Sequence, residues 1–342
     1  MIRYGGLRSF FIFSLYSPLI TMPLKRIHSA AREPQVLVIL GPTASGKSDL
    51  ALAVAKLAGG EIISADSRQI YRELDIGAAK PSPEALGEVK HHFINEKNIG
   101  EPFTAGEFAT EATERIHDIH QRGKRAIVAG GSTLYLEGLL EGFADLPPAD
   151  TVIRKRLLEE IEGGGKEQLY ELLRQKDPEQ AATLDPTKTQ RLIRSLEIIE
   201  ITGLTVTELQ ARGKERQSGL SFITIGLATP RPELYQRINL RVEKMVEAGL
   251  LQEAEGLYRK YHQLLLPGKI TALQSVGYQE LFQYLDGKIT LSEAVTLIQQ
   301  HTRNYAKRQL TFFKNRLNVT WLDAPEESGE RNALARRLTK MF

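Results

Sequence analysis

Short apolar runs of strand length alternate with amphipathic stretches along most of the chain. The runs cover residues 36–40, 61–64, 125–129, 222–227 and 319–322. Runs that are apolar on both sides are typical of buried parallel strands. Helical patterns lie between them, one from Lys47 onward and another at residues 107–121. This alternation predicts an α/β fold, a doubly wound parallel sheet flanked by helices.

The pattern changes between residues 145 and 218. Apolar residues recur there at helical spacing, as at Leu192, Leu196 and Ile199, and no run of strand type occurs. Residues 145–218 are therefore predicted to form an all-helical insertion domain. Residues 34–144 and 219–342 would form the core around it.

The first 33 residues differ from the rest. Residues 1–32 contain no Asp or Glu, and basic residues flank an apolar stretch at 10–20. Three interpretations remain open: an over-long start or disordered tail, with Met22 as the working initiator; an organellar transit segment; or a secretory signal. We exclude this extension from the fold prediction.

Composition narrows the function classes. The 342 residues are 42% hydrophobic and 25% charged, which is typical of a globular protein. The chain has no cysteine, which excludes a disulfide scaffold, a thiol nucleophile and zinc–thiolate or iron–sulfur sites. No apolar run reaches the length of about 18 residues that a spanning helix needs. The net charge of +3 neither requires nor forbids a nucleic-acid partner.

A complete phosphate-loop motif, GPTASGKS, follows the first apolar run. Its glycines let backbone N–H groups surround phosphate oxygens, and the following helix adds its positive N-terminal end. The lysine supplies a charge, and Ser48 can bind a phosphate-borne Mg²⁺. The residues predicted to bind a diphosphate or triphosphate are Gly41, Pro42, Thr43, Ala44, Ser45, Gly46, Lys47 and Ser48.

A second acidic signal of nucleotide hydrolases and kinases is missing. Such enzymes usually carry an Asp at the end of a later apolar strand. Here the run at 125–129 leads into Gly130, Gly131 and Ser132 instead. Asp66 follows the second run, so the carboxyl edge of the sheet would place it near the phosphate loop. From spacing alone, Asp66 is either a base or a helix cap or Mg²⁺-supporting group.

Together these motifs resemble the tRNA dimethylallyltransferases of bacterial type. The resemblance spans roughly residues 35–316, and only the phosphate loop is generic. The motifs are GPTASGKS (41–48), ADSRQIY (65–71), LDIGAAKP (74–81), HHF (91–93), GGSTLY (130–135), DPE (177–179), QRLIRSLE (190–197), TG (202–203), RINLRVEKM (237–245), GL (249–250), VGY (276–278) and TRNYAKRQ (302–309).

The resemblance implies transfer of a dimethylallyl group from dimethylallyl diphosphate to the N6 amine of adenosine 37 in tRNA. It implies that Asp66 is the general base and that Mg²⁺ on Ser48 assists the leaving diphosphate. Catalytic roles would fall to Asp66, Lys47, Ser48, Ser132 and Arg241. The family has Thr where this chain has Ser132, and the hydroxyl is kept.

Arg237 and Arg241 lie four residues apart, on one helical face. They would clamp the diphosphate, with Arg241 as the preferred ligand by resemblance. The alternative is a pair of surface salt bridges with Glu233 and Glu243.

By resemblance, the insertion would bind the anticodon arm of tRNA. Arg191 and Arg194 lie within about 60° on a helical wheel, beside an apolar stripe, and Arg154 adds charge. The alternative is that these are solvated charges. The tRNA-binding residues would be Asp66, Ser67, Arg68, Gln69, Ser132, Arg154, Gln190, Arg191, Leu192, Ile193 and Arg194. The Asn-Asp pair common in the family is replaced by Thr187-Lys188, which leaves the local helix start open.

Other candidate residues have alternative roles. Three basic residues would extend the RNA-binding surface or only solubilise a helix, namely Arg303, Lys307 and Lys314. Three aromatic residues would stack on a base or belong to the core, namely Tyr71, Tyr135 and Tyr278. A structural role is expected for His91 and His92. A small-molecule kinase and a catalytically silent RNA-binding protein remain alternative functions. The resemblance implies a cytoplasmic monomer with no membrane partner.

Overall fold

A single parallel sheet forms the centre of the protein. The computed structural model describes residues 35–144, 146–185, 187–213, 219–264 and 271–342, so the extension at 1–33 lies outside the described residues. Within them, six strands pair in the order β3-β2-β4-β1-β5-β6, all parallel. The strands are β1 (Gln35–Leu40), β2 (Glu61–Ala65), β3 (His91–His92), β4 (Ala126–Gly130), β5 (Ser221–Ala228) and β6 (Thr320–Asp323). The five predicted strands are confirmed, whereas β3 is too short to leave a hydrophobic run.

Helices form most of the connections between the strands of the described chain. They are α1 (Lys47–Ala58), α2 (Pro83–Glu88), α3 (Ala105–Gln121), α4 (Thr133–Glu141), α5 (Thr151–Glu162), α6 (Lys166–Lys176), α7 (Pro178–Thr183), α8 (Thr189–Thr202), α9 (Val206–Ala211), α10 (Arg231–Glu247), α11 (Leu250–Tyr261), α12 (Tyr278–Leu285), α13 (Leu291–Arg316) and α14 (Ser328–Thr339). Two short 3₁₀ turns are η1 (His262–Leu264) and η2 (Thr271–Leu273). No helix among the described residues combines the length and the apolar character needed to cross a membrane.

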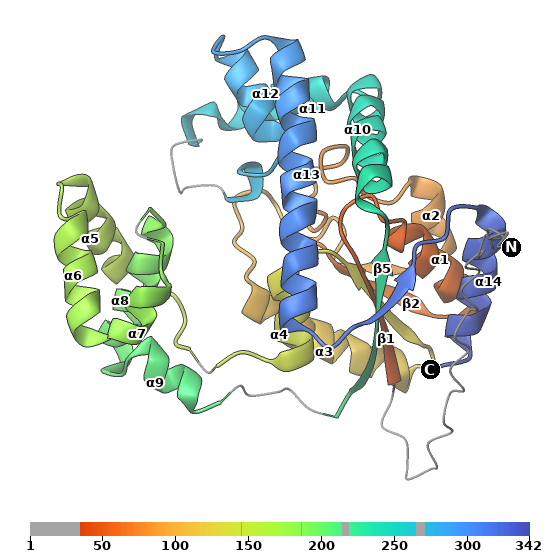
Figure 1. Ribbon diagram of the computed structural model, residues 1–342, viewed down its shortest axis with the longest axis horizontal. Helices are drawn as coiled ribbons and strands as arrows, with labels where there is room; N and C mark the ends of the chain where they lie inside the picture. The colour runs from red at the N-terminus through yellow and green to blue at the C-terminus, as the bar shows by residue number, and fades with distance from the viewer. Residues whose placement is uncertain (1–34, 145, 186, 214–218, 265–270) are drawn as a thin grey trace, which may run out of the picture. The chain divides into compact units, whose positions relative to one another are not determined.

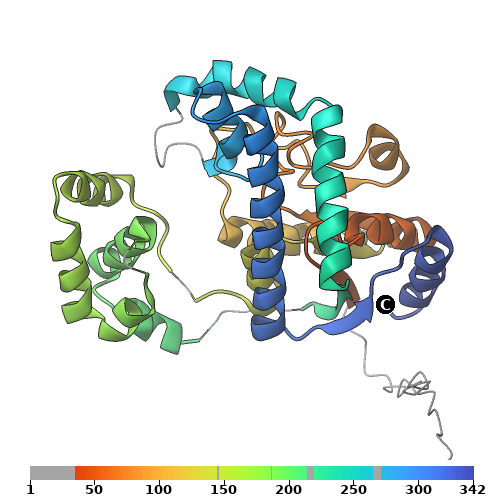
Figure 2. The same ribbon diagram turned by 45° about the horizontal axis from the view of Figure 1, so that its top comes forward.

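Helices cover both faces of the sheet, which confirms the doubly wound prediction. Successive residues of β1 point to opposite faces. Val36 and Val38 pack in a core with residues of α3, α4 and α13. Leu37 and Ile39 pack in a second core with residues of α1 and α14. Figures 1 and 2 show α1 and α14 side by side on their face of the sheet.

Two long helices, α10 and α13, lie side by side and project from the carboxyl edge of the sheet (Figures 1 and 2). The chain enters α10 directly after β5, through Pro230 at the N-cap. Ile238 of α10 and Ala306 of α13 are buried in one shared cluster. Arg303 of α13 also donates a hydrogen bond to Asn239 Oδ1 at 2.6 Å. The two helices are therefore fixed to each other where they border the site.

Helices α5 to α9 form a group with its own hydrophobic cluster, and we refer to them as the helical group. Its buried members include Leu157, Leu173 and Leu196, from three different helices. The structure assigns no strand between residues 146 and 213, apart from residue 186, which is not described. The helical character predicted for this segment is confirmed there. Residues 145 and 214–218 lie outside the described part, and the domain limits remain a prediction.

Of the two adjacent histidines, His92 has a structural role where β2 begins, whereas His91 lines a cavity beside the phosphate loop. His92 Nε2 lies 2.8 Å from Oε2 of Glu61, a carboxylate that is only 1% exposed at the start of β2. Arg122 and Lys124 also bond this carboxylate. Burial acts to raise the pKa of Glu61, but the Arg122 hydrogen bond, aided by the other partners, holds it well below the usual range. The described residues contain no group of three or more His, Asp or Glu that could hold a metal.

Candidate active site

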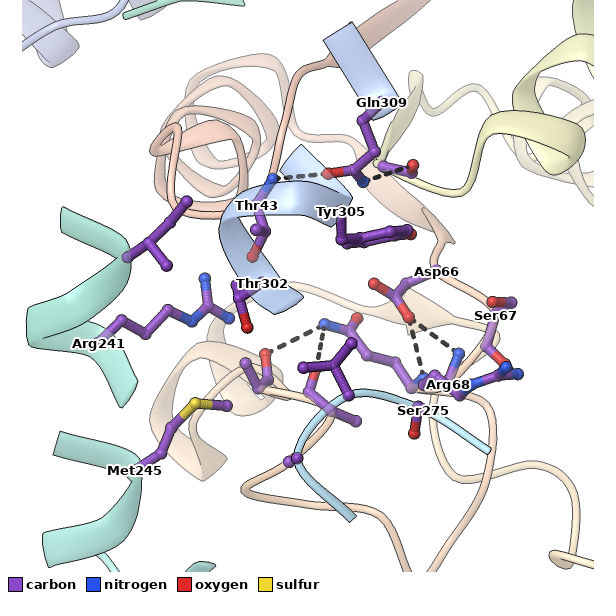
Figure 3. Close-up of a pocket in the computed structure, with 18 of the residues that line it drawn as sticks. Thr43, Asp66, Ser67, Arg68, Arg241, Met245, Ser275, Thr302, Tyr305 and Gln309 are labelled. Atoms are coloured by element: carbon purple, nitrogen blue, oxygen red, sulfur yellow. Dashed lines mark hydrogen bonds between the residues drawn. The ribbon is translucent and has the colours of Figure 1, made fainter. Parts of the chain in front are cut away.

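A cavity of about 400 Å³ lies at the carboxyl ends of β1, β2 and β4 (Figure 3). The loops after these strands form one part of its wall, and α10 and α13 form another. Lys47, Asp66, Arg241, Thr302 and Tyr305 are among the residues that line it. Ligands of open α/β sheets bind at this edge, so the cavity is the candidate active site.

The phosphate loop, residues 41–48, connects β1 to α1 as predicted. Gly46 is the N-cap of α1 and has a left-handed backbone with φ of 81°. Lys47 folds back, and its Nζ donates to the carbonyl of Pro42 at 3.1 Å. The hydroxyl of Ser45 is buried and has no hydrogen-bond partner in the part of the chain that the structure describes. The loop thus keeps a lysine and a polar hydroxyl for an anion to engage.

Gln309 of α13 connects the phosphate loop to the end of β4. Its side-chain oxygen accepts a hydrogen bond from the N–H of Thr43 at 3.0 Å, and its amide donates to the carbonyl of Gly131 at 2.7 Å. A Cβ at position 131 would lie 2.4 Å from Gln309 Nε2 and 3.5 Å from Lys47 Cε. A side chain at position 131 would therefore displace the Gln309 amide from this contact. Gln309 belongs to the motif at residues 302–309, but its role could not be predicted from the sequence, because the contact joins segments far apart in the chain.

The cationic side of the cavity is strongly desolvated. Burial, together with the nearby Arg241 charge, lowers the pKa of Lys47 to about 8, although Asp66 acts in the opposite direction. Burial likewise lowers the pKa of Arg241, against the attraction of Asp66 and Asp49. Two cations held close together without a full set of anions create a strong preference for a negatively charged ligand.

The carboxylate of Asp66 caps a turn and leaves one oxygen unbonded. Its Oδ1 accepts hydrogen bonds from the N–H of Arg68 at 2.9 Å and of Gln69 at 3.4 Å. No helix begins in this described segment before α2, so the expectation that Asp66 caps a helix is wrong. Its Oδ2 has no hydrogen bond within the described residues, and Figure 3 shows Asp66 and Arg241 approaching the cavity from opposite sides in this view. The turn uses only Oδ1, so Oδ2 is available for the predicted role as a base.

Two other residues of the ADSRQIY motif are held in place by segments outside it. The Ser132 hydroxyl accepts from the N–H of Ser67 at 2.8 Å, and Ser132 is not part of the cavity wall. The Gln69 amide donates to the carbonyls of Ala78 and Ala79, at 3.3 and 3.1 Å. Ser67, Arg68 and Gln69 do line the cavity.

The two arginines of α10 have different surroundings. Arg237 forms an ion pair with Glu233 and faces a second cavity of about 700 Å³, which also reaches Lys47, Ser48 and Arg241. Arg241 faces both cavities and forms no ion pair with any described residue. The salt-bridge alternative therefore applies to Arg237, and Arg241 remains free for a ligand.

In the helical group, two of the predicted RNA-binding arginines are engaged within the protein. Arg154 and Arg194 both bond the carboxylate of Glu197, which is fully buried. Burial acts to raise the pKa of Glu197, but these hydrogen bonds outweigh it and hold the pKa below its usual range. Arg191 is exposed and forms no ion pair in the described part of the chain.

The remaining candidates are divided between core and surface. Leu192 and Ile193 are buried within the helical group, whereas Gln190 is exposed. Tyr71, Tyr135 and Tyr278 are all buried, as expected of core residues. The ring of Tyr135 stacks on Phe108 at 4.3 Å between centroids. Lys314 lies over the ring of Trp321, and Lys307 is exposed.

Fold and site together define a phosphate-loop protein whose loop lines one cavity with a carboxylate and an arginine. Comparison with known proteins identifies the family: the model described as IPP transferase matches residues 69–316, and the chain belongs to this family. The resemblance inferred from the motifs is thereby confirmed.

Several relatives cover nearly the whole chain. A tRNA dimethylallyltransferase of Pelodictyon phaeoclathratiforme is 72% identical over 310 residues, which is 90% of this chain and 98% of the relative. The crystal structure of the full-length tRNA isopentenylpyrophosphate transferase from Bacillus halodurans is 36% identical, with a TM-score of 0.64, over 90% of this chain and 96% of that chain. A eukaryotic dimethylallyltransferase acting on tRNA is 29% identical, with a TM-score of 0.74, over 89% of this chain and 78% of that chain.

Proposed function

We propose that this protein transfers the dimethylallyl group of dimethylallyl diphosphate to the N6 amine of adenosine 37 in tRNA. The observation that carries the proposal is that the phosphate loop, Arg241 and Asp66 line one cavity. One oxygen of Asp66, Oδ2, forms no hydrogen bond with the described residues and is therefore available. At the end of β4, Gly130 and Gly131 stand in place of the carboxylate that nucleotide-hydrolysing enzymes use. The names of the relatives support transfer to tRNA.

The donor would place its diphosphate on the phosphate loop. The bond between the allylic carbon and the diphosphate oxygen breaks, and its electron pair leaves with the diphosphate. Lys47, the loop N–H groups and Arg241 would neutralise the charge that develops on this leaving group. The buried Ser45 hydroxyl, which lacks a partner among the described residues, would donate to a phosphate oxygen.

The acceptor amine would attack the same carbon. As the bond between N6 and carbon forms, N6 must lose a proton, and Asp66 Oδ2 would accept it. Asp66 Oδ1 stays bonded to the N–H groups of Arg68 and Gln69, so the carboxylate keeps its orientation during proton transfer. An exocyclic adenine amine is a weak nucleophile, so a positioned base contributes directly to the rate.

The residues present fit a phosphate-borne Mg²⁺. The chain offers the exposed hydroxyl of Ser48 at the cavity, and no cluster of three carboxylates or histidines among the described residues. Mg²⁺ commonly binds through substrate phosphates, waters and few protein ligands, which matches this donor set. When bound, the ion would add positive charge near the leaving diphosphate.

For tRNA, the helical group would contact the anticodon arm, with exposed Arg191 and Gln190 as direct contacts. Arg154 and Arg194 would act mainly by fixing the helices through Glu197. We assign the protein to the cytoplasm as a monomer, without a membrane partner.

Mass spectrometry of tRNA nucleosides tests the proposal. After incubation with dimethylallyl diphosphate, Mg²⁺ and unmodified tRNA, we expect one adenosine per tRNA to gain a single C5H8 unit at N6. A parallel reaction with γ-labelled ATP distinguishes the alternatives. Phosphate transfer to a small molecule would indicate a kinase, and tRNA binding with neither transfer would indicate a silent RNA-binding protein.

A further inference from the structure

Along α10, the wall of the first cavity changes from charged to apolar with distance from the sheet. α10 begins at the carboxyl edge, and Arg241, Val242 and Met245 all face the cavity. Met245 is one turn beyond Arg241, about 6 Å further along the helix axis. Figure 3 shows the two side chains one above the other on α10. Leu250, Val276 and Ile298 complete this apolar region.

The backbone behind this region is held firmly. Glu253 of α11 accepts hydrogen bonds from the N–H groups of Ile76 at 2.8 Å and Gly77 at 3.0 Å. The hydroxyl of Tyr278 donates to the same carboxylate at 2.5 Å. Tyr278 is fully buried, and a Cβ on Gly77 would lie 2.4 Å from its ring. The neighbouring Ala78, which lines the cavity, is therefore unable to move outward without breaking these hydrogen bonds.

Met245 is the long side chain of this apolar region. Val242, Leu250 and Ile298 are buried in the main hydrophobic core, so other side chains hold them in place. Met245 and Val276 are only partly buried. The methionine side chain is unbranched and can change its conformation to fit an apolar group, but it still occupies the same volume in the cavity. The side chain of Met245 therefore sets how much space the cavity leaves beyond Arg241.

We infer that Met245 limits the prenyl donor to one five-carbon unit. The inference rests on the proposed function, because it assigns the apolar region to the dimethylallyl group. With the diphosphate on the phosphate loop and Arg241, the two methyl groups of the donor lie against Met245. A ten-carbon geranyl chain would have to occupy the space of the Met245 side chain. The longer donor is therefore excluded by a steric clash with the Met245 side chain.

Competition between two donors tests this assignment. The quantity to measure is the ratio of kcat/KM for geranyl diphosphate to that for dimethylallyl diphosphate, with tRNA as acceptor. Met245→Ala removes Cγ, Sδ and Cε, and we expect the ratio to rise by about 10–200-fold, the range for small changes in apolar pockets. Met245→Leu fills a similar volume and should keep the ratio low. Met341→Ala is the matched control, because Met341 packs against the separate core formed with α1 and α14.

Two further measurements separate the possible failures. Affinity for inorganic diphosphate should be equal in wild type and Met245→Ala, because the phosphate loop is untouched. Met245→Phe, which narrows the cavity, should raise the KM for dimethylallyl diphosphate, and it tests the assignment even if the alanine variant fails to fold. An active wild type that accepts both donors equally, or a Met245→Ala ratio equal to wild type, overturns the inference alone. No transfer by wild type from either donor overturns the proposed function as well.

Discussion

The side-chain oxygen of Gln309 accepts a hydrogen bond from the N–H of Thr43, 266 residues earlier in the chain. The same side chain donates to the carbonyl of Gly131, and it is 2% exposed. One buried amide thus fixes the phosphate loop relative to β4 and to α13. The helix that carries Gln309 also presents Thr302, Tyr305 and Arg308 to the cavity. The position of the phosphate loop and the geometry of the cavity wall are therefore linked through this residue.

Gln309→Leu should weaken binding of inorganic diphosphate by about tenfold and lower the free energy of unfolding by about 1–3 kcal/mol, because it leaves the Thr43 N–H and the Gly131 carbonyl without partners. Calorimetric titration and urea unfolding measure the two effects. Gln299→Leu serves as control, since Gln299 of α13 bonds Asn239 and Glu243 away from the loop. Equal diphosphate affinity in both variants would show that Gln309 does not position the loop.

Asp66→Asn should reduce kcat by about 10²–10⁴-fold, the usual range for a positioned base. The amide oxygen of asparagine still accepts from the N–H groups of Arg68 and Gln69, so the local fold and diphosphate affinity should persist. Single-turnover prenyl transfer measures the chemical step. Asp185→Asn, which alters a similar loop cap in the helical group, should have no effect on this rate. A near-normal rate in Asp66→Asn would remove this carboxylate from the mechanism.

The activity should fall at alkaline pH through Lys47. Its folded-state pKa is lowered to about 8, and the charged form is the one that attracts diphosphate. Loss of the proton therefore decreases kcat/KM for the donor as pH rises through 8. The kcat/KM profile reports the free enzyme, in which this pKa applies. Lys47→Arg, whose charge persists, should show lower activity at neutral pH but no such fall near pH 8. An unchanged alkaline limb in that variant would assign it to another group.

Arg191→Ala should weaken tRNA binding and reduce the slope of log affinity against log salt by about 0.7–0.9, the effect of one lost phosphate contact. Arg194→Ala should instead destabilise the helical group, because it removes a partner of buried Glu197. Filter binding at several salt concentrations and thermal unfolding distinguish the two. Arg174→Ala, on α6 and paired with Glu171, is the control. An unaltered slope for Arg191→Ala would place this arginine outside the RNA contact.

The alternation of strands and helices could be predicted because the sheet is buried on both faces. Such strands leave continuous apolar runs, as at residues 36–40. The phosphate loop was predictable because its chemistry requires glycine, lysine and serine at fixed spacing. β3 could not be predicted, since two residues carry no periodicity. The family resemblance supplied the roles of Asp66 and Arg241, which spacing alone left undecided.

Contacts between distant segments were the part that the sequence did not reveal. Nothing in the local pattern indicates that Glu253 accepts hydrogen bonds from the N–H groups of residues 75–77. Nor does it indicate that Arg154 and Arg194 both donate hydrogen bonds to the carboxylate of Glu197. A helical wheel places arginines on a face, but it does not show whether a buried carboxylate lies opposite. The family resemblance predicted RNA contacts for three arginines, and the structure shows that two of them also form ion pairs with Glu197.

If the phosphate loop serves departure of a diphosphate and not hydrolysis of ATP, diphosphate release and prenyl transfer must occur together. Both are measured in one reaction containing labelled dimethylallyl diphosphate, Mg²⁺ and tRNA. We expect one diphosphate released per prenyl group transferred, release only when tRNA is present, and a loss of both by several orders of magnitude in Lys47→Ala. We also expect that tRNA does not stimulate phosphate release from ATP. Robust tRNA-stimulated ATP hydrolysis without prenyl transfer would show instead that the loop serves ATP hydrolysis.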